Sequence, residues 1–129
     1  MNIHDDADDL KKKLNPLAYA VCVNQATEPP FSGVDLTQGK KGIFRCICCR
    51  APLFHTMHKF DSNSGWPSFF QPHTEKALEY QQDYRLAQPR TEVKCANCKA
   101  HLGHVFPDGP LPTGMRFCIN TVALAFDAE

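Results

Sequence analysis

Seven cysteines in a chain of 129 residues point to thiol chemistry, because a thiolate can both attack other groups and bind metal ions. Cys118 lies in the run Arg116-Phe117-Cys118-Ile119-Asn120 near the end of the chain. Four other cysteines form two Cys-x-x-Cys pairs, Cys46/Cys49 and Cys95/Cys98. These arrangements predict a reactive thiol and a metal site.

The run around Cys118 predicts a β-strand, because apolar residues recur at a spacing close to two. On a regular strand Arg116, Cys118 and Asn120 share one face, with Phe117 and Ile119 on the other. A neighbouring positive charge favours the thiolate, which is the nucleophilic form of cysteine. Arg116 therefore suits a supporting role, although a surface or structural salt bridge explains an arginine here equally well.

The two Cys-x-x-Cys pairs match a structural zinc site with four thiolate ligands and no open position. Such a site connects two distant segments of the chain. Cys48 lies between the first two ligands, but Cys46/Cys49 is the pair that reproduces the spacing of Cys95/Cys98. Reduced core cysteines or one redox-active pair are the alternatives, and thiolates also suit iron.

Composition excludes several classes of function. Basic and acidic residues number 14 each, so the chain has no charge excess for binding nucleic acid. It has no apolar run of roughly 20 residues for a membrane helix and no secretory signal at its acidic N-terminus. We expect one domain over residues 1–129, in the reducing cytoplasm.

The strand signals after residue 40 predict a mainly antiparallel β domain. Residues 42–46 and 92–95 each read as a strand that runs into a cysteine pair. The N-terminus predicts a helical appendage over residues 1–17, with an amphipathic helix from Asp6 that ends near Pro16. A short strand is expected at residues 19–23.

His101 and His104 follow the second cysteine pair directly. Each could be a metal ligand, a satisfied core residue or an acid/base group, but four cysteines already complete a metal shell. Two histidines beside a nucleophile fit the thiol-plus-base pattern of covalent catalysis. Trp66 is the single tryptophan, and a lone tryptophan is more often a core residue than part of a pocket.

Together these segments closely resemble the B-type peptide methionine sulfoxide reductases, from about residue 10 to the end. Beside the cysteine pairs, the matching motifs are Thr27-Glu28-Pro29-Pro30-Phe31-Ser32-Gly33, Gly65-Trp66-Pro67-Ser68-Phe69, His101-Leu102-Gly103-His104-Val105-Phe106-Pro107-Asp108-Gly109-Pro110 and Arg116-Phe117-Cys118-Ile119-Asn120. Ordered motifs of this length are highly specific.

The resemblance implies two packed antiparallel sheets, a β-tent, around a structural zinc ion. It implies that Cys118 attacks the sulfoxide sulfur of peptide-bound methionine R-sulfoxide and retains a sulfenic acid. Trp66 and Phe106 would then bind the substrate, while His101, His104 and Asn120 hold the sulfoxide oxygen. The implied role is repair of oxidised proteins by a monomer, with thioredoxin as the reductant.

The sequence departs from the commonest family pattern at the cysteine that resolves the sulfenic acid, because Ser64 occupies its position. Cys22 and Cys48 remain, and Cys48 is constrained between metal ligands. Our hypothesis is that Cys22 resolves Cys118. The alternative is that Cys22 is a buried apolar residue and that an external thiol reduces the sulfenic acid directly.

Two functions of other classes compete with this interpretation. A zinc-ribbon interaction module without catalysis accounts for the four paired cysteines, but it leaves Cys118, Trp66 and the two histidines unexplained. A zinc hydrolase or deaminase requires an open metal position and a general-base glutamate near the ligands. The sequence suggests neither feature.

Overall fold

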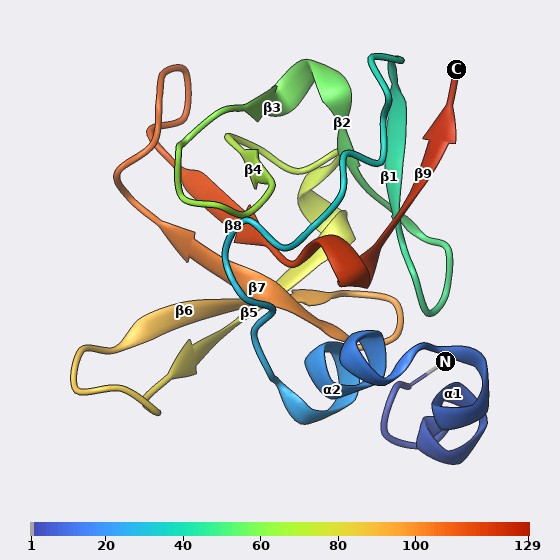
Figure 1. Cartoon of the computed structure of the whole chain (residues 1–129). Helices are drawn as coiled ribbons and strands as arrows, with labels where there is room; N and C mark the ends of the chain where they lie inside the picture. Colours follow the sequence, from blue (N-terminus) through green and yellow to red (C-terminus); the bar gives the residue numbers. More distant parts are fainter. Residues whose placement is uncertain (1) are drawn as a thin grey trace.

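Residues 2–129, which the computed structural model describes, form two antiparallel sheets with two helices at the N-terminal end (Figure 1). The smaller sheet has the order β2-β1-β9, from β1 (Gly42–Cys46), β2 (Pro52–His55) and β9 (Leu124–Ala128). The larger sheet has the order β3-β4-β8-β7-β6-β5. Its strands are β3 (Lys59–Phe60), β4 (Ser68–Phe69), β5 (Leu78–Asp83), β6 (Arg90–Cys95), β7 (His101–Phe106) and β8 (Arg116–Ile119). Short 3-10 turns lie at η1 (Thr56–His58), η2 (Glu75–Ala77) and η3 (Thr121–Ala123). The predicted two-sheet β fold is confirmed.

Aromatic side chains from both sheets meet in the core. Phe54 of β2 stacks on Phe69 of β4 with ring centroids 4.2 Å apart. Phe44 of β1 contacts the same ring edge-on at 5.1 Å, and all three side chains are buried. Burial of such large apolar surfaces is the main term that holds the two sheets together.

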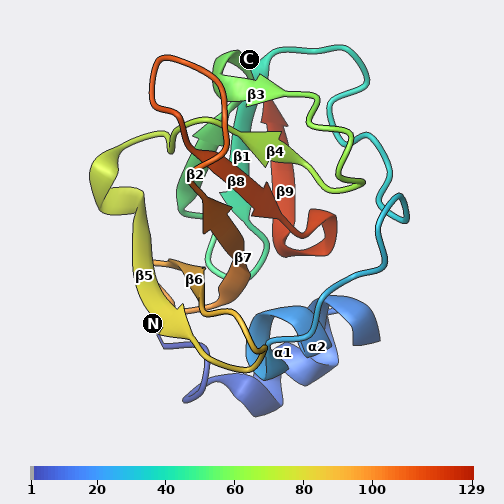
Figure 2. The same cartoon turned by 90° about the vertical axis from the view of Figure 1, so that its left-hand side faces the viewer.

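The N-terminal segment contains two helices, α1 (Ala7–Lys13) and α2 (Pro16–Asn24). Pro16 does not end the first helix but begins the second, since proline suits a first helical turn and the Asn15 side chain accepts a hydrogen bond from Ala18 N at 2.8 Å. The predicted strand at residues 19–23 is wrong for the same reason. Figures 1 and 2 show both helices at one end of the molecule.

Among the described residues, no helix has the length and apolar character needed to cross a membrane.

Strand β7 contains one extra residue where it pairs with β6. Val93 lies opposite Gly103, but the next residue, Lys94, lies opposite His101, so Leu102 is unpaired. Residues three apart point to opposite faces of a regular strand. This bulge therefore brings His101 and His104 to the same face of the sheet, with ring centroids 5.5 Å apart.

Gly103 permits the close approach of β7 to the strand that carries Cys118. A Cβ atom at this position would lie 2.0 Å from the carbonyl oxygen of Cys118. Any side chain would push the two strands apart, so the pairing of β7 with β8 depends on glycine here.

Candidate active site

Cys118 lies in a row of paired side chains that crosses three strands of the larger sheet. Ser68 of β4 is its partner on one side, and His104 of β7 is its partner on the other. Directly paired residues point to the same face with neighbouring Cβ atoms. Arg116, two residues before Cys118 on β8, shares this face, as the strand spacing predicted.

The thiol of Cys118 contacts one cation and two hydroxyl groups. Arg116 donates from Nη1 to Cys118 Sγ at 2.8 Å. The hydroxyl oxygens of Ser64 and Ser68 lie 3.8 and 3.9 Å from the same sulfur. A thiolate at this position would therefore be stabilised by a charge-assisted hydrogen bond.

Arg116 is fixed by two neighbours. Asp108 accepts from Nε at 2.8 Å and from Nη2 at 3.1 Å, and the guanidinium carbon lies 4.5 Å from the centroid of the Phe106 ring. The hydrogen bonds to Asp108 raise the pKa of Arg116 and lower the pKa of Asp108. The cation therefore stays charged and keeps its orientation toward the thiol.

A cavity of about 230 Å³ opens beside Cys118. Trp66 and Phe106 supply aromatic surface, and His104, Arg116 and Asn120 supply polar groups. An apolar wall with a few convergent polar groups is typical of a small-ligand site. The complete lining is Thr27, Trp66, Arg90, Gly103, His104, Phe106, Arg116, Cys118 and Asn120.

His104 is oriented by a buried carboxylate. Its Nε2 lies 2.8 Å from Asp83 Oδ2, and Arg85 donates to the same oxygen at 2.8 Å. These contacts, first among them the Arg85 hydrogen bond, hold the pKa of Asp83 well below its ordinary range. Burial lowers the pKa of His104, and this outweighs the opposing effect of Asp83. His104 is therefore neutral near pH 7, with its proton on Nε2, and Nδ1 is left as a proton acceptor.

His101 lies behind His104 and does not line the cavity. Its side chain is 2% exposed, and its Nδ1 lies 2.7 Å from Glu92 Oε2. Within residues 2–129 its other ring nitrogen, Nε2, has no hydrogen-bond partner. Burial opposes ionisation of Glu92, but the hydrogen bonds from His101 and Gln25 lower the pKa of this carboxyl. Glu92 pairs directly with His104 across the strands, so its side chain lies on the same face of the sheet as both histidines.

Glu28, in the loop that follows α2, forms hydrogen bonds with two residues that line the cavity. Its carbonyl oxygen accepts from Trp66 Nε1 at 2.9 Å, and its backbone nitrogen donates to Asn120 Oδ1 at 2.9 Å. Its carboxylate is buried and accepts from the backbone nitrogen of Val122 at 3.0 Å. The indole and the amide therefore have fixed orientations. Asn120 also donates one hydrogen of Nδ2 to Leu102 O at 2.8 Å, so the second hydrogen on Nδ2 remains for another acceptor.

The ligand atoms of Cys46, Cys49, Cys95 and Cys98 all lie within 4.8 Å of one another, so these residues can hold one metal ion. Cys46 Sγ is 3.6 Å from Cys98 Sγ, and Cys49 Sγ is 3.6 Å from Cys95 Sγ. Tetrahedral zinc with Zn–S bonds of about 2.3 Å separates its sulfurs by about 3.8 Å, so the cluster fits this ion.

The two cysteine turns of the cluster have the same backbone geometry. Arg50 donates its backbone N–H to Cys46 O, and Lys99 donates to Cys95 O in the same way. Both residues have positive φ, 68° and 70°. The first turn follows β1 and the second follows β6, so the cluster links the smaller sheet to the larger one.

Cys22 and Cys48 lie away from the cavity. Cys22 is on α2 with 1% of its surface exposed, and it packs in the core beside Cys48. Neither residue lines the cavity that contains Cys118. The helix that carries Cys22, α2, packs against β7 and η3.

Sequence reasoning did not identify Asp83, Glu92 or Asp108 as parts of the site. Asp83 and Glu92 had no detectable signal, because a single carboxylate on a strand is normally a solvated residue. Asp108 had a detectable signal in the sequence, since it lies within the motif that follows His104.

Comparisons with known proteins agree on one family. The model of the SelR domain matches residues 14–128. A relative from Pasteurella multocida, named "Peptide methionine sulfoxide reductase MsrB", is 51% identical over 117 residues, which cover 91% of this chain and 90% of the relative. Proteins of the same name from Thioalkalivibrio sulfidiphilus and Escherichia coli (strain K12 / DH10B) are 54% and 48% identical; they cover 94% and 93% of this chain, and 88% of each relative is matched.

Among solved structures, the "Crystal Structure of Mis18 'Yippee-like' Domain" is similar with a TM-score of 0.53. The match covers 70% of this chain and 98% of that one, at 13% sequence identity. At this identity the likeness concerns the fold alone.

Proposed function

This chain belongs to the B-type peptide methionine sulfoxide reductases, and from this premise we propose how its residues reduce methionine R-sulfoxide. The proposal rests chiefly on one observation, the 2.8 Å contact between Arg116 and Cys118 at the wall of an aromatic cavity.

The sulfoxide side chain enters the cavity of about 230 Å³ with its methyl group against Trp66 and Phe106. Its oxygen then faces His104 and Asn120, which lie on the same cavity. The fixed indole supports selection of one epimer. If the methyl group of the S epimer lay against the indole, its oxygen would point away from the place that the oxygen of the R epimer occupies. His101 acts indirectly, by supporting His104 through Glu92.

The reaction transfers one oxygen atom between two sulfurs. His104 Nδ1 accepts the thiol proton, and the Cys118 thiolate, stabilised by Arg116, attacks the sulfoxide sulfur. This attack forms an S–S bond, and the imidazolium beside Asp83 gives the proton to the sulfoxide oxygen, a general-acid step of about 10²- to 10⁴-fold benefit. The oxygen leaves as hydroxide and adds to the Cys118 sulfur, which breaks the S–S bond and returns its electron pair to the methionine sulfur. The products are methionine and Cys118 sulfenic acid, so methionine sulfur is reduced by two electrons and cysteine sulfur is oxidised by two.

An external dithiol of the thioredoxin type restores Cys118. Its first thiolate attacks the sulfenic acid and releases water, and its second thiolate breaks the mixed disulfide. Burial of Cys22 favours this direct route, and resolution by Cys22 stays a prediction. The seven free cysteines suit a reducing cytoplasm. Action as a monomer stays a prediction.

Zinc is the metal that we propose for Cys46, Cys49, Cys95 and Cys98, in a structural role. Four thiolates leave no position for substrate, and Cys118 is not among them. Bound zinc would hold the two sheets together and take no part in the chemistry.

The deciding experiment compares Cys118→Ser with the matched variant Cys48→Ser. Each is incubated with methionine R- and S-sulfoxide in a blocked peptide and with dithiothreitol, and the zinc content is measured. Wild type and Cys48→Ser should consume only the R epimer, while Cys118→Ser should retain zinc and lose activity. Activity in Cys118→Ser, or loss of its zinc, would contradict the assignment.

Mass spectrometry after one equivalent of sulfoxide distinguishes the routes of recovery. Direct reduction predicts a sulfenic acid on Cys118 with Cys22 free. A peptide cross-linked through Cys22 and Cys118 would instead establish Cys22 as the resolving residue.

A further inference from the structure

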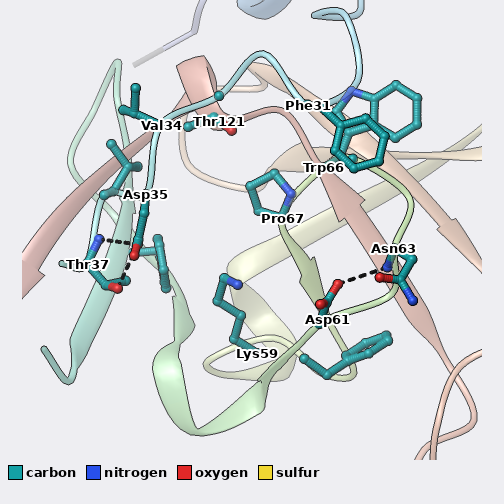
Figure 3. A pocket seen from close by; sticks show the side chains of 15 residues that line it. Phe31, Val34, Asp35, Thr37, Lys59, Asp61, Asn63, Trp66, Pro67 and Thr121 are labelled. Carbon is teal, nitrogen blue, oxygen red and sulfur yellow. Dashed lines mark hydrogen bonds between the residues drawn. The ribbon is translucent and has the colours of Figure 1, made fainter. Parts of the chain in front are cut away.

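A second cavity, of about 390 Å³, adjoins the site and shares Trp66 with it (Figure 3). One wall is the loop of residues 31–37, and the other is the segment of residues 59–67. Its volume lies within the range of about 300 to 1,000 Å³ that is usual for ligand pockets. None of the catalytic steps above uses this cavity.

Exposed apolar side chains border the second cavity. Phe31 is 78% exposed and Val34 is 73% exposed, and Leu36, Phe60 and Pro67 extend the apolar lining. Both Phe31 and Trp66 line this cavity (Figure 3). Contiguous exposed apolar surface of this kind marks an interaction site more often than isolated surface residues do.

The backbone holds Phe31 in this exposed position. Its φ angle is 61°, a left-handed conformation that is uncommon for a bulky residue. Its N–H donates to Gly65 O at 2.7 Å, and a Cβ atom on Gly65 would lie 2.8 Å from the Phe31 ring. Gly65, the residue before Trp66, therefore fixes the Phe31 ring at the edge of the second cavity.

Six of the fifteen residues that line this cavity are polar or charged, and two of them are carboxylates that accept local hydrogen bonds. Asp35 accepts hydrogen bonds from Thr37, and Asp61 accepts one from the backbone of Asn63. Figure 3 shows the Lys59 side chain extending from the wall opposite the loop of residues 31–37. The apolar part of the lining, which includes Phe31, Val34 and Pro67, suits an apolar side chain.

We propose that the second cavity binds the polypeptide next to the oxidised methionine and prefers an apolar side chain at that neighbouring position. The proposal rests on the function proposed above, because a sulfoxide that is peptide-bound and lies beside Cys118 has neighbouring residues outside the first cavity. Since Trp66 lines both cavities, a chain that leaves the first one meets Phe31 and Val34. Burial of an apolar neighbour there removes its surface, and that of the exposed Phe31 and Val34, from water.

The experiment uses three substrates: a blocked peptide with leucine on both sides of methionine R-sulfoxide, the same peptide with serine there, and N-acetyl-methionine R-sulfoxide amide. Wild type should show a KM for the leucine peptide about tenfold below that for the serine peptide. In Phe31→Ser and Val34→Ser this difference should shrink severalfold. The KM for the blocked single residue should not change.

Leu86→Ser is the matched control, because Leu86 is 56% exposed and lines neither cavity. It should keep the preference for the leucine peptide. Equal KM values for the two peptides in wild type, or an unchanged preference in both variants, would overturn the proposal. A parallel loss on the blocked single residue would also overturn it, because the variants would then act on the first cavity. Failure of wild type on all three substrates would instead contradict the proposed function itself.

Discussion

Arg116 reaches Cys118 with one guanidinium nitrogen while two others are bound to Asp108. Nη1 lies 2.8 Å from the sulfur, whereas Nε and Nη2 donate to the carboxylate. Such a two-point ion pair restricts the arginine more than a single contact does, because the planar guanidinium matches a carboxylate. The position of the positive charge is therefore set before the substrate arrives.

Arg116→Ala should lower kcat/KM for peptide methionine R-sulfoxide by about 10- to 100-fold, because a charge-assisted hydrogen bond to the thiolate is lost. Alkylation of Cys118 by iodoacetamide at pH 7 should slow in parallel, since only the thiolate reacts. Arg45→Ala is the control, because Arg45 forms an ion pair with the exposed Asp127. An unchanged alkylation rate in Arg116→Ala would exclude a role for the charge.

Asp83 and His104 make the stability of the protein depend on pH. The pKa of Asp83 is lower in the folded chain than its ordinary value, because Arg85 and His104 donate to its buried carboxylate. The ionised carboxylate therefore stabilises the fold fully above about pH 4, and this contribution is lost as the pH falls toward the folded pKa. The lowered pKa of His104 acts in the same direction, because a histidine that is neutral in the fold makes the fold less stable as the pH falls below about 6.5.

Asp83→Asn should lower the free energy of unfolding at pH 7 by about 1 to 3 kcal/mol. The difference from wild type should shrink as the pH falls from about 4 toward 2, because the unfolded wild-type chain then binds a proton on Asp83 that folding must remove. Urea unfolding at several pH values measures this, with Asp127→Asn as an exposed control. A difference that stays constant over this range would show that the carboxylate charge is unimportant.

The turn of residues 61–67 brings Ser64 close to the sulfur of Cys118. Ser62 bonds to both Ser64 and Ser68 through its hydroxyl, and Ser68 pairs with Cys118 across the sheet. The Ser64 hydroxyl is consequently 3.8 Å from Cys118 Sγ. A thiol at position 64 would need only a small movement to form a disulfide.

Ser64→Cys should convert the sulfenic acid of Cys118 into an internal disulfide after one turnover. Thiol titration after one equivalent of sulfoxide should find two thiols fewer than before, whereas wild type should lose one. The double variant with Cys118→Ser is the control and should lose none. Persistence of a sulfenic acid in Ser64→Cys would show that the turn does not hold position 64 in reach.

The four-cysteine cluster connects parts of the molecule that share no sheet. Cys46 ends β1 of the smaller sheet, and Cys95 ends β6 of the larger one. The aromatic core lies between the same two sheets. A small domain buries little apolar surface, so a metal ion bound at this junction would add to its stability.

Metal removal should destabilise the whole fold and should not act as reversible inhibition. We expect the melting temperature to fall by more than about 10 °C in a strong chelator, with activity lost over the same range of conditions. Calorimetry with a parallel zinc measurement checks this, and Cys95→Ser should have the same effect. A metal-free protein that melts normally but is inactive would point to a catalytic metal.

The fold class and the chemistry of individual segments followed from local patterns. The period-two run at Cys118 is a strand, and the two Cys-x-x-Cys pairs form one cluster. Pro16 misled the prediction, because proline both ends and begins helices, and the capping contact of Asn15 decides which occurs.

By itself, the sequence determined which residue types are available and how neighbours along one strand or turn are oriented, because these depend on local backbone geometry. Only the tertiary structure decided which distant groups meet, such as Asp83 with His104 and Asp108 with Arg116, and it placed Cys22 in the buried core. The physical reason is strand register. One unpaired residue at Leu102 reverses the face to which His101 points, and the sequence pattern does not reveal that bulge.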